Sequence, residues 1–257
     1  MKIASYNVNS LRVRLPVVLR WLTEHQVDVL CVQETKVQDG DFPSEAFDSI
    51  GYRYAFKGQK SYNGVAILST HPIEQTEYGL HDEPKDEARL IKVRINGIYI
   101  VNTYVPQGES PDSLKFQYKL QWFGRLRKFF EQNFGPEDPV LWAGDLNIAP
   151  EPIDVYEPER LLGHVCFHPD VHKALREVMD WGFVDVFRKH CDKAGEYTFW
   201  DYRFRDFFKR NLGWRLDHIM ATAPLAKRCS ACYIDREPRA AERPSDHTPI
   251  VAEFGQP

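Results

Sequence analysis

The sequence predicts an α/β fold in which strands and helices alternate along one continuous length of chain. Strand-like apolar runs and amphipathic helical stretches follow one another from the first residues to the last. The dipeptide Asn96-Gly97 separates two strand-like runs and is a strong hairpin signal, so the sheets are at least partly antiparallel. No Gly/Ser-rich linker, low-complexity segment or internal repeat interrupts the 257 residues. We therefore expect a single domain, residues 1–257.

Each predicted element rests on its hydrophobic period and on the residues that flank it. Short apolar runs of β type predict strands at 2–7, 27–34, 64–69, 89–95, 98–106, 139–147, 214–222 and 248–254. Amphipathic stretches predict helices at 16–25, 112–134 and 172–190. Gly135-Pro136 ends the second helix, and Gly182 breaks the third.

Composition places the chain among ordinary globular proteins. Hydrophobic residues make up 43% and charged residues 27%. No uncharged apolar stretch approaches the roughly 20 residues that a membrane helix needs. The first residues enter a strand-like run at once, which leaves no room for a secretory signal. We therefore expect no membrane association and a cytoplasmic location.

The five cysteines do not form a recognisable disulfide framework, because their number is odd and the chain is long. Cys229 and Cys232 have CxxC spacing, but no second CxxC completes a zinc knuckle. A denser group of ligand types lies at His164, Cys166, His168 and His172. Reduced cysteines without a metal are favoured over a structural zinc site.

Basic residues gather in two segments although the formal net charge is −4. Segment 115–128 holds five basic residues and no acid, and segment 199–215 combines five basic residues with seven aromatic ones. Basic and aromatic side chains together suit contact with phosphates and stacking on bases or sugars. For either segment taken alone, a solvated helix face or an aromatic-rich loop is the simpler interpretation.

Acidic residues stand within or at the ends of several strand-like runs. Unpaired burial of a carboxylate is costly, so a set of them suggests one shared cleft at an edge of the sheets. Oxygen ligands favour a hard cation such as Mg²⁺ or Mn²⁺ over zinc. The pattern therefore predicts metal-assisted phosphoester hydrolysis. The residues concerned are Glu34, Asp145, Asp217 and Asp246, joined by Asn7 and Asn147.

Motifs along the whole chain point to a family. In order they are IASYNVNSLR, VDVLCVQETK, SYNGVAI, VNTYVPQG, WAGDLNIAP, YTFWDYR, GWRLDHI and PSDHTPI. Together these motifs resemble the exonuclease III branch of the endonuclease/exonuclease/phosphatase superfamily, which includes the major apurinic/apyrimidinic (AP) endonucleases. The resemblance implies a four-layer α/β sandwich, with two packed mixed, largely antiparallel β-sheets flanked by helices and one active site at the top.

The resemblance also implies a metal site. Glu34 matches the principal ligand of the family's Mg²⁺, for which Mn²⁺ is expected to substitute, and Asn7 lies beside it. Asp246 matches a carboxylate near the metal. Position 9 is Asn, where some AP endonucleases carry Asp, so a ligand charge is missing and the number of metal ions stays open.

Catalytic roles follow from the same match. Asp145 and Asn147 correspond to the pair that positions and activates the attacking water, and Tyr104 lies near the scissile phosphate. Asp217 corresponds to the partner that orients His247. A carboxylate beside this ring favours its protonated form, which makes Asp145 the better candidate for the base.

A substrate pocket is implied by Phe199, Trp214 and Leu216, which match the apolar residues that accept a flipped-out abasic sugar. The alternative is that they are core residues under a loop. Gln107 and Arg215 are the further residues expected to contact DNA. The loop 107–112 contains no arginine, so a DNA-penetrating arginine found there in some relatives is absent.

Three functions are compatible with these observations. The leading one is a Mg²⁺-dependent repair nuclease, a monomer, that cuts double-stranded DNA 5′ to abasic sites and processes 3′ ends. The second is a phosphatase of inositol or sphingolipid phosphoesters. The third is a catalytically inactive binding protein, which the presence of every expected ligand disfavours.

Overall fold

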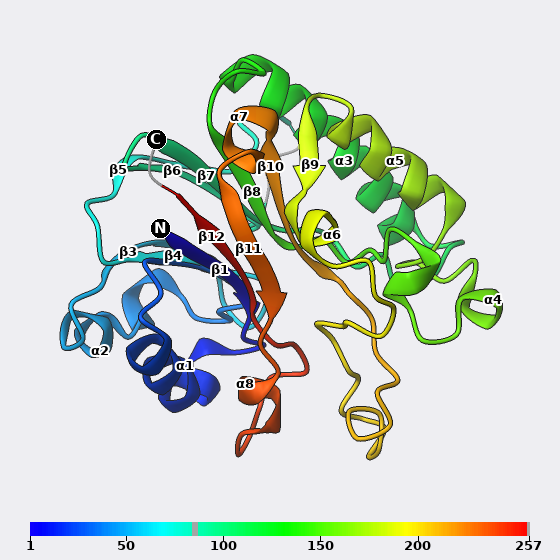
Figure 1. Cartoon of the computed structure of the whole chain (residues 1–257), viewed down its shortest axis with the longest axis horizontal. Coiled ribbons are helices and arrows are strands. Elements are labelled where there is room, and N and C mark those ends of the chain that lie inside the picture. Colours follow the sequence, from blue (N-terminus) through cyan, green and yellow to red (C-terminus); the bar gives the residue numbers. More distant parts are fainter. Residues whose placement is uncertain (84–86, 256–257) are drawn as a thin grey trace.

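The computed structural model describes residues 1–83 and 87–255. In this part of the chain, two six-stranded sheets pack face to face, and helices cover both outer surfaces (Figure 1). The predicted four-layer α/β sandwich is confirmed.

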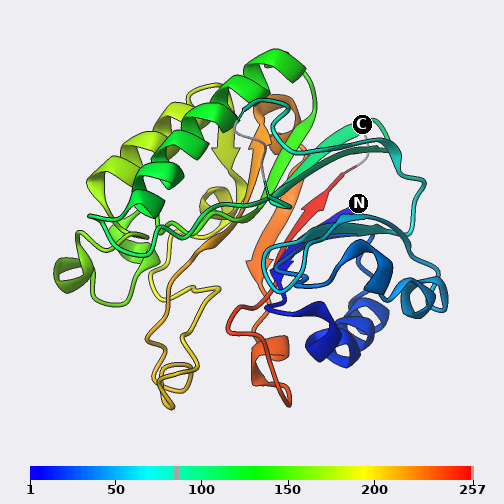
Figure 2. The ribbon, with the colours of Figure 1, turned by 180° about the vertical axis from the view of Figure 1, so that it is seen from behind.

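The first sheet contains both ends of the described chain. Its strand order is β11-β12-β1-β2-β4-β3, with β1 parallel to β2 and all other neighbours antiparallel. Figure 2 shows β1 and β12 side by side, coloured blue and red. The strands are β1 (Lys2–Asn7), β2 (Val29–Gln33), β3 (Arg53–Lys57), β4 (Val65–Ser69), β11 (Cys229–Ile234) and β12 (Ile250–Phe254).

The second sheet has the order β5-β6-β7-β8-β10-β9, with β7 parallel to β8 and the rest antiparallel. The predicted hairpin is present: Asn96 and Gly97 both have positive φ, as its tight turn requires, and Ile95 pairs with Ile98. The strands are β5 (Glu74–Tyr78), β6 (Leu90–Ile95), β7 (Ile98–Tyr104), β8 (Val140–Asp145), β9 (Phe183–Asp185) and β10 (Asp217–Thr222).

Four helices of the described chain lie on the outer faces of the sheets. α1 (Leu11–His25) and α2 (Ser44–Asp48) cover the first sheet, while α3 (Leu114–Asn133) and α5 (Pro169–Met179) cover the second. The shorter helical segments are the 3₁₀ turns η1 (Asp39–Asp41) and η2 (Pro152–Asp154), and α4 (Pro158–Leu161), α6 (Val186–His190), α7 (Ala223–Ala226) and α8 (Glu237–Ala240). None of the described helices is both long and apolar enough to cross a membrane.

Side-chain alternation explains how polar groups reach one end of the sandwich. Along a strand, every second side chain points to the same face. Ile3 belongs to the core between the sheets, so Asn7, four residues later on β1, lies on that same inward face. On β8, Ala143 lies in this core, and Asp145 follows two residues later. Apolar residues thus fill the middle of the sandwich, while polar residues occupy its end.

The structure corrects several predicted elements. Residues 172–190 are not one broken helix, because β9 (Phe183–Asp185) lies between α5 and α6. The strands β3, β5 and β11 were not predicted, and α1 begins at Leu11 with Pro16 inside it. Strand β5 is polar and mostly exposed at the edge of its sheet, so its sequence carries no apolar alternation.

Candidate active site

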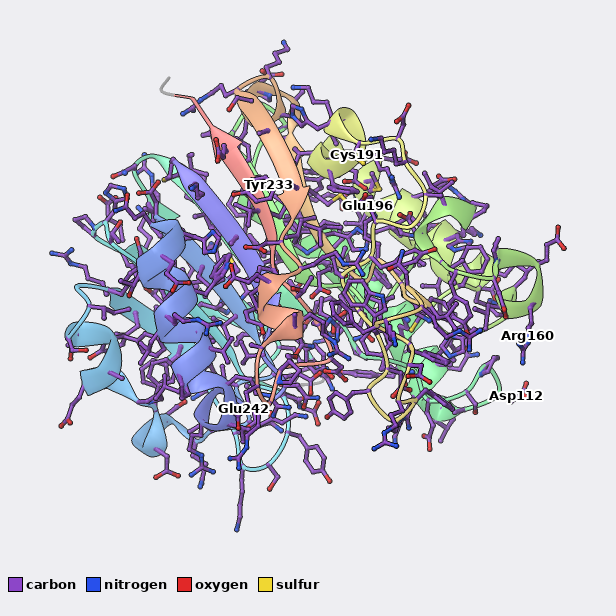
Figure 3. The ribbon with its side chains drawn as sticks, turned by 60° about the horizontal axis from the view of Figure 1, so that its bottom comes forward. Asp112, Arg160, Cys191, Glu196, Tyr233 and Glu242 are labelled. Carbon is purple, nitrogen blue, oxygen red and sulfur yellow. The ribbon has the colours of Figure 1, made fainter. Side chains whose placement is uncertain are left out.

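A cleft of about 530 Å³ opens at the end of the sandwich where β1, β2, β7 and β8 end and β10 begins. The long loop between α6 and β10 and the segment around α8 both project from this end in Figures 1 and 2. Figure 3 brings it forward, with Glu242 near α8 and with Arg160 and Asp112 at the opposite margin. Of the predicted residues, Glu34, Tyr104, Gln107, Asp145, Asn147, Phe199, Trp214, Leu216, Asp246 and His247 line the cleft.

Asn7 joins the two principal carboxylates. Its side-chain nitrogen donates to Glu34 Oε1 and to Asp145 Oδ2, both at 2.8 Å. The other oxygen of Glu34 lies 2.8 Å from Nζ of Lys36, a residue that the sequence analysis did not single out although it stands in the same QETK motif. Two carboxylates therefore face one small volume, and Asn7 holds them at a defined separation.

Glu34 and Asn147 both have a left-handed backbone, with φ values near 50°. Residues other than glycine adopt this conformation at a cost, and it persists only where the surroundings impose it. The amide of Asn147 donates to Asp145 Oδ1 at 2.9 Å, and its side chain donates to the carbonyl of Val105 at 2.9 Å. These bonds stabilise the turn that presents Asp145 to the cleft.

His247 lies between two aspartates. Its Nδ1 is 2.7 Å from Asp217 Oδ2, and its Nε2 is 3.8 Å from Asp145 Oδ2. Burial alone lowers the pKa of His247, but the charges of Asp217 and Asp145 overcome this and raise it to about 10. At neutral pH the ring is therefore protonated and can only donate hydrogen bonds.

Asp145 is buried, and its carboxyl group has a raised pKa. Burial raises its pKa to about 7, an increase that the charge of His247 opposes and that the carboxylates of Asp217 and Glu34 reinforce. Tyr104 lies beside the same carboxylates, and its pKa is also raised, first by burial and then by Glu34 and Asp145. Tyr104 therefore remains a neutral hydroxyl donor.

Asp246 does not orient the neighbouring histidine. Its Oδ1 accepts hydrogen bonds from Asn9 Nδ2 at 2.9 Å and from the hydroxyl of Ser245 at 3.3 Å. The same nitrogen of Asn9 lies 2.9 Å from the hydroxyl of Tyr202 in the aromatic loop. Asp246 thus connects the start of β12 to the loop after β1, at the side of the cleft where Glu34 lies.

The apolar wall of the cleft contains the three predicted pocket residues and several others. The Phe199 ring lies 4.9 Å from that of His247, and the Phe199 backbone pairs with that of Trp214 through two hydrogen bonds of 2.9 Å. Trp214 and Leu216 line the same cleft. Sequence reasoning singled out segment 199–215 and His164 without assigning their side chains to this pocket, and it missed Tyr156 and Leu161, which carry no motif. The residues that complete the wall are Tyr156, Leu161, His164, Asp201, Arg203, Phe204 and Phe207.

The expectation that Arg215 contacts DNA is wrong. Its side chain has no exposed surface, and it forms ion pairs with Asp154 at 2.6 Å and Asp185 at 2.8 Å. Because Trp214 and Leu216 point into the cleft, the residue between them points away from it. A fully buried guanidinium cannot contact DNA, so Arg215 supports the fold beneath the cleft. Gln107, in contrast, is exposed at the cleft, although its side-chain oxygen accepts from the amide of Glu109.

The disfavoured zinc site finds no support among the described residues. His164 and His168 each accept a hydrogen bond from a backbone amide, and His172 Nε2 lies 2.9 Å from the carbonyl of Ala149. All five cysteines are free thiols.

The donor set of the cleft fits a hard divalent cation. Carboxylate oxygens come from Glu34 and Asp246, which both line the cleft. Asn7, expected as a further ligand, instead turns its side-chain nitrogen to Glu34 and Asp145, and its side-chain oxygen accepts from the amide of Asn9. Ligand atoms of Asp145, Asp217 and His247 also lie within 4.8 Å of one another. A protonated His247 cannot ligate a cation, however, so the Glu34 side is the better site.

Comparisons with known proteins agree with this geometry. A family model described as the endonuclease/exonuclease/phosphatase family matches residues 4–247. Exodeoxyribonuclease III of Haemophilus influenzae is 34% identical over 267 residues, which cover 99% of this chain and 100% of that protein.

Two solved structures are similar over the whole of both chains. An AP endonuclease from Archaeoglobus fulgidus is 51% identical with a TM-score of 0.98. The 3′ phosphatase NExo from Neisseria, bound to a product DNA hairpin, is 37% identical with a TM-score of 0.94. The chain therefore belongs to the endonuclease/exonuclease/phosphatase family, in the branch that contains exodeoxyribonuclease III and the AP endonucleases.

Proposed function

We propose that this chain is a Mg²⁺-dependent DNA-repair nuclease that cuts double-stranded DNA 5′ to abasic sites and removes nucleotides and blocking groups from 3′ ends. One observation carries the proposal: a buried carboxylate, amide and histidine cluster lies beside an aromatic-walled cleft. The named activities of the relatives, an exodeoxyribonuclease III, an AP endonuclease and a DNA-bound 3′ phosphatase, support this substrate class.

Asp145 is the proposed base. Water is a poor nucleophile at neutral pH, and a general base is most effective when its pKa lies near the working pH. The raised pKa of Asp145, about 7, meets this condition, and Asn7 and Asn147 hold the carboxylate in one orientation. The Asn147 side chain, in the same turn, positions the attacking water.

His247 is the proposed electrostatic partner of the phosphate. Asp217 keeps the ring protonated and in one orientation, so that its Nε2–H can donate to a phosphoryl oxygen as negative charge develops there. Tyr104 adds a neutral hydroxyl donor at the same end of the cleft.

The cation would be held by Glu34 and Asp246, and Asn7 would orient the Glu34 carboxylate through its side-chain nitrogen. When bound, a divalent cation neutralises charge on the phosphodiester and on its leaving oxygen. We propose Mg²⁺, because such sites bind through one or two carboxylates and wait for a phosphate oxygen, and we expect Mn²⁺ to substitute.

The wall formed by Phe199, Trp214 and Leu216 is the proposed pocket for the abasic sugar. A nucleotide without a base costs least to rotate out of the duplex, because no stacking is lost. An apolar pocket then excludes an intact, polar nucleotide more strongly than a bare sugar.

A single assay set tests this function. Duplexes with a central abasic analogue or a recessed 3′ end are incubated with Mg²⁺ over a concentration series, and the products are sized. We expect a cut on the 5′ side of the abasic residue, shortening from the 3′ end, and loss of both activities in EDTA. Absence of cleavage, together with hydrolysis of a soluble inositol polyphosphate, would instead identify the phosphatase.

Three further proposals concern the whole molecule. Residues 1–257 act as one catalytic domain, which the pairing of β1 with β12 supports, and a single cooperative unfolding transition would agree with it. The protein is a monomer in solution, as sedimentation or light scattering can measure. We also place it in the cytoplasm.

A further inference from the structure

Lys119 is a buried lysine to which the proposed mechanism gives no role. It lies on α3, whose other buried residues are apolar, and its side chain has no exposed surface. Lysine is among the residues least often buried completely, because removing its charge from water is costly. A buried ammonium of this kind needs hydrogen-bond partners, and those partners indicate its purpose.

The three partners of Lys119 are backbone carbonyls from three separate loops. Its Nζ donates to Asn147 at 2.7 Å, to Val165 at 2.7 Å and to Gln107 at 3.2 Å. An ammonium group has three hydrogens, so all of its donors are used. The loops follow β7, follow β8 and precede α5. Direct bonds join these loops in pairs, from Asn147 Nδ2 to the carbonyl of Val105 at 2.9 Å and from the amide of Ala149 to the carbonyl of Cys166 at 2.8 Å, and Lys119 is bonded to all three.

Each of these loops contributes a wall of the cleft. Gln107 and Asn147 line it directly, and Cys166 lines it next to Val165. The stem of Lys119 also lies close to Gly108 in the loop after β7. A side chain added at this glycine would be only 3.4 Å from Lys119 Cδ, which leaves no free space between them. Lys119 therefore adds one shared bond to each of the catalytic turn, the loop after β7 and the pocket wall.

The catalytic turn needs such support. Asn147 has a φ of 50°, a left-handed conformation that asparagine tolerates better than other residues with a Cβ, and hydrogen bonds of the surroundings select it here. The ammonium attracts the carbonyl of this residue from behind the cleft, while Asp145 Oδ1 accepts from its amide within the cleft. The two bonds thus fix the peptide before Asn147 and the peptide after it.

We infer that Lys119 is a positioning residue, which holds the turn carrying Asp145 and Asn147 in register with the two other walls of the cleft. It does not touch the reacting atoms, and its effect is exerted through backbone carbonyls. This inference rests on the proposed function, since the turn matters for turnover only if Asp145 and Asn147 act on water. Misplacement by about 1 Å can lower a rate about 100-fold, so the loss is expected in kcat.

The test compares Lys119→Met with Lys92→Met. Lys92 is a nearly buried lysine whose Nζ contacts Asn133, near the far end of the same helix, and Glu77, both at 2.9 Å. Methionine keeps the apolar stem and removes the charge and the donors in both variants. Lys92→Met therefore controls for the general loss of stability that follows removal of a buried ammonium.

We measure kcat and KM on the abasic duplex at a temperature at which thermal unfolding shows each variant to be folded. Lys119→Met is expected to lose about 10- to 100-fold in kcat with KM changed less than about threefold, and Lys92→Met to keep kcat within about twofold. Equal kcat in the two variants would overturn the inference. If Lys119→Met does not fold, Lys119→Gln, which retains one amide donor, is measured by the same criteria.

Hydrogen exchange gives a readout that does not depend on activity. Amides in 105–109, 145–149 and 163–167 should exchange faster in Lys119→Met than in wild type, and should be unchanged in Lys92→Met. Unchanged exchange in these loops would also overturn the inference. If the wild type cuts no DNA, the proposed function fails, while the exchange data still decide whether Lys119 holds the loops.

Discussion

Acidification should destabilise this protein through one buried ring, His218. The side chain is completely buried beneath the cleft, with Nε2 at 2.9 Å from the carbonyl of Ile148 and Nδ1 at 3.0 Å from Arg215 Nη1. A guanidinium can only donate, so Nδ1 must accept and the ring is neutral. Burial, and then the charge of Arg215, lower the pKa of His218 from 6.5 to about 4.

The direction of the effect follows from proton binding. Below about pH 6.5 the unfolded chain takes up a proton at this residue, whereas the folded protein does so only near its own, lower pKa. The contribution of His218 to stability is therefore complete above the pKa of the unfolded state, about 6.5. It falls as the pH decreases from about 6.5 to about 4, and it changes no further below the pKa of the folded state. Each unit of difference between the folded and unfolded pKa corresponds to about 1.4 kcal/mol, so His218 can lower the free energy of unfolding by at most about 3 kcal/mol. About 2 kcal/mol of this is lost between pH 7 and pH 4.5.

The assay is urea unfolding of wild type and His218→Gln at several pH values. Carboxylates also titrate in this range, so the informative quantity is the difference in unfolding free energy between the two proteins. That difference should shrink by about 2 kcal/mol on going from pH 7 to pH 4.5, because only the wild type carries the buried ring. His190→Gln, at an exposed histidine, serves as the control. A difference that stays constant across this range would refute the reasoning.

Three other predictions concern activity. Asp145→Asn should lower kcat by about 100- to 10,000-fold with little change in KM, since it removes the proposed base, and a variant that keeps most of the wild-type rate would exclude that role. Glu34→Ala should require much more Mg²⁺ for half-maximal activity in a metal titration, and cleavage that neither this change nor EDTA affects would show that no cation is needed. Trp214→Ala should reduce kcat/KM on the abasic duplex by about 10- to 200-fold, because apolar contact with the sugar is lost, and affect shortening of a recessed 3′ end less; the pocket assignment is wrong if both fall equally.

Local patterns predicted the elements whose formation depends on neighbours in sequence. The hairpin at Asn96 and Gly97 needs positive φ at two adjacent positions, which this dipeptide adopts readily. The predicted helix 112–134 agrees with α3, Leu114–Asn133, because its apolar period and its Gly-Pro stop are both local. Strand β9 escaped prediction because three residues between two helical segments carry too little period to recognise.

The residue types of the active site could also be recognised in the sequence, but most of the contacts among them could not. Acids at strand ends indicated a shared cleft, and the whole-length resemblance to a family implied which residues occupy it. The resemblance implied that Asp217 orients His247, and the two residues, thirty positions apart, are in contact; the bond between the adjacent Asp246 and Asn9 is seen only in the structure. Such pairs depend on the order and register of the strands, which distant segments decide together.

By itself, the sequence determined the family, the α/β layers and the set of oxygen and nitrogen groups available for phosphoester chemistry. Tertiary structure alone decided which side of a strand or loop each group faces. Arg215 stands between two cleft residues and yet points into buried ion pairs, whereas Lys119, on an outer helix, reaches three loops of the cleft. The physical reason is that burial and hydrogen bonding depend on contacts between segments far apart in the chain, and no local pattern encodes those contacts.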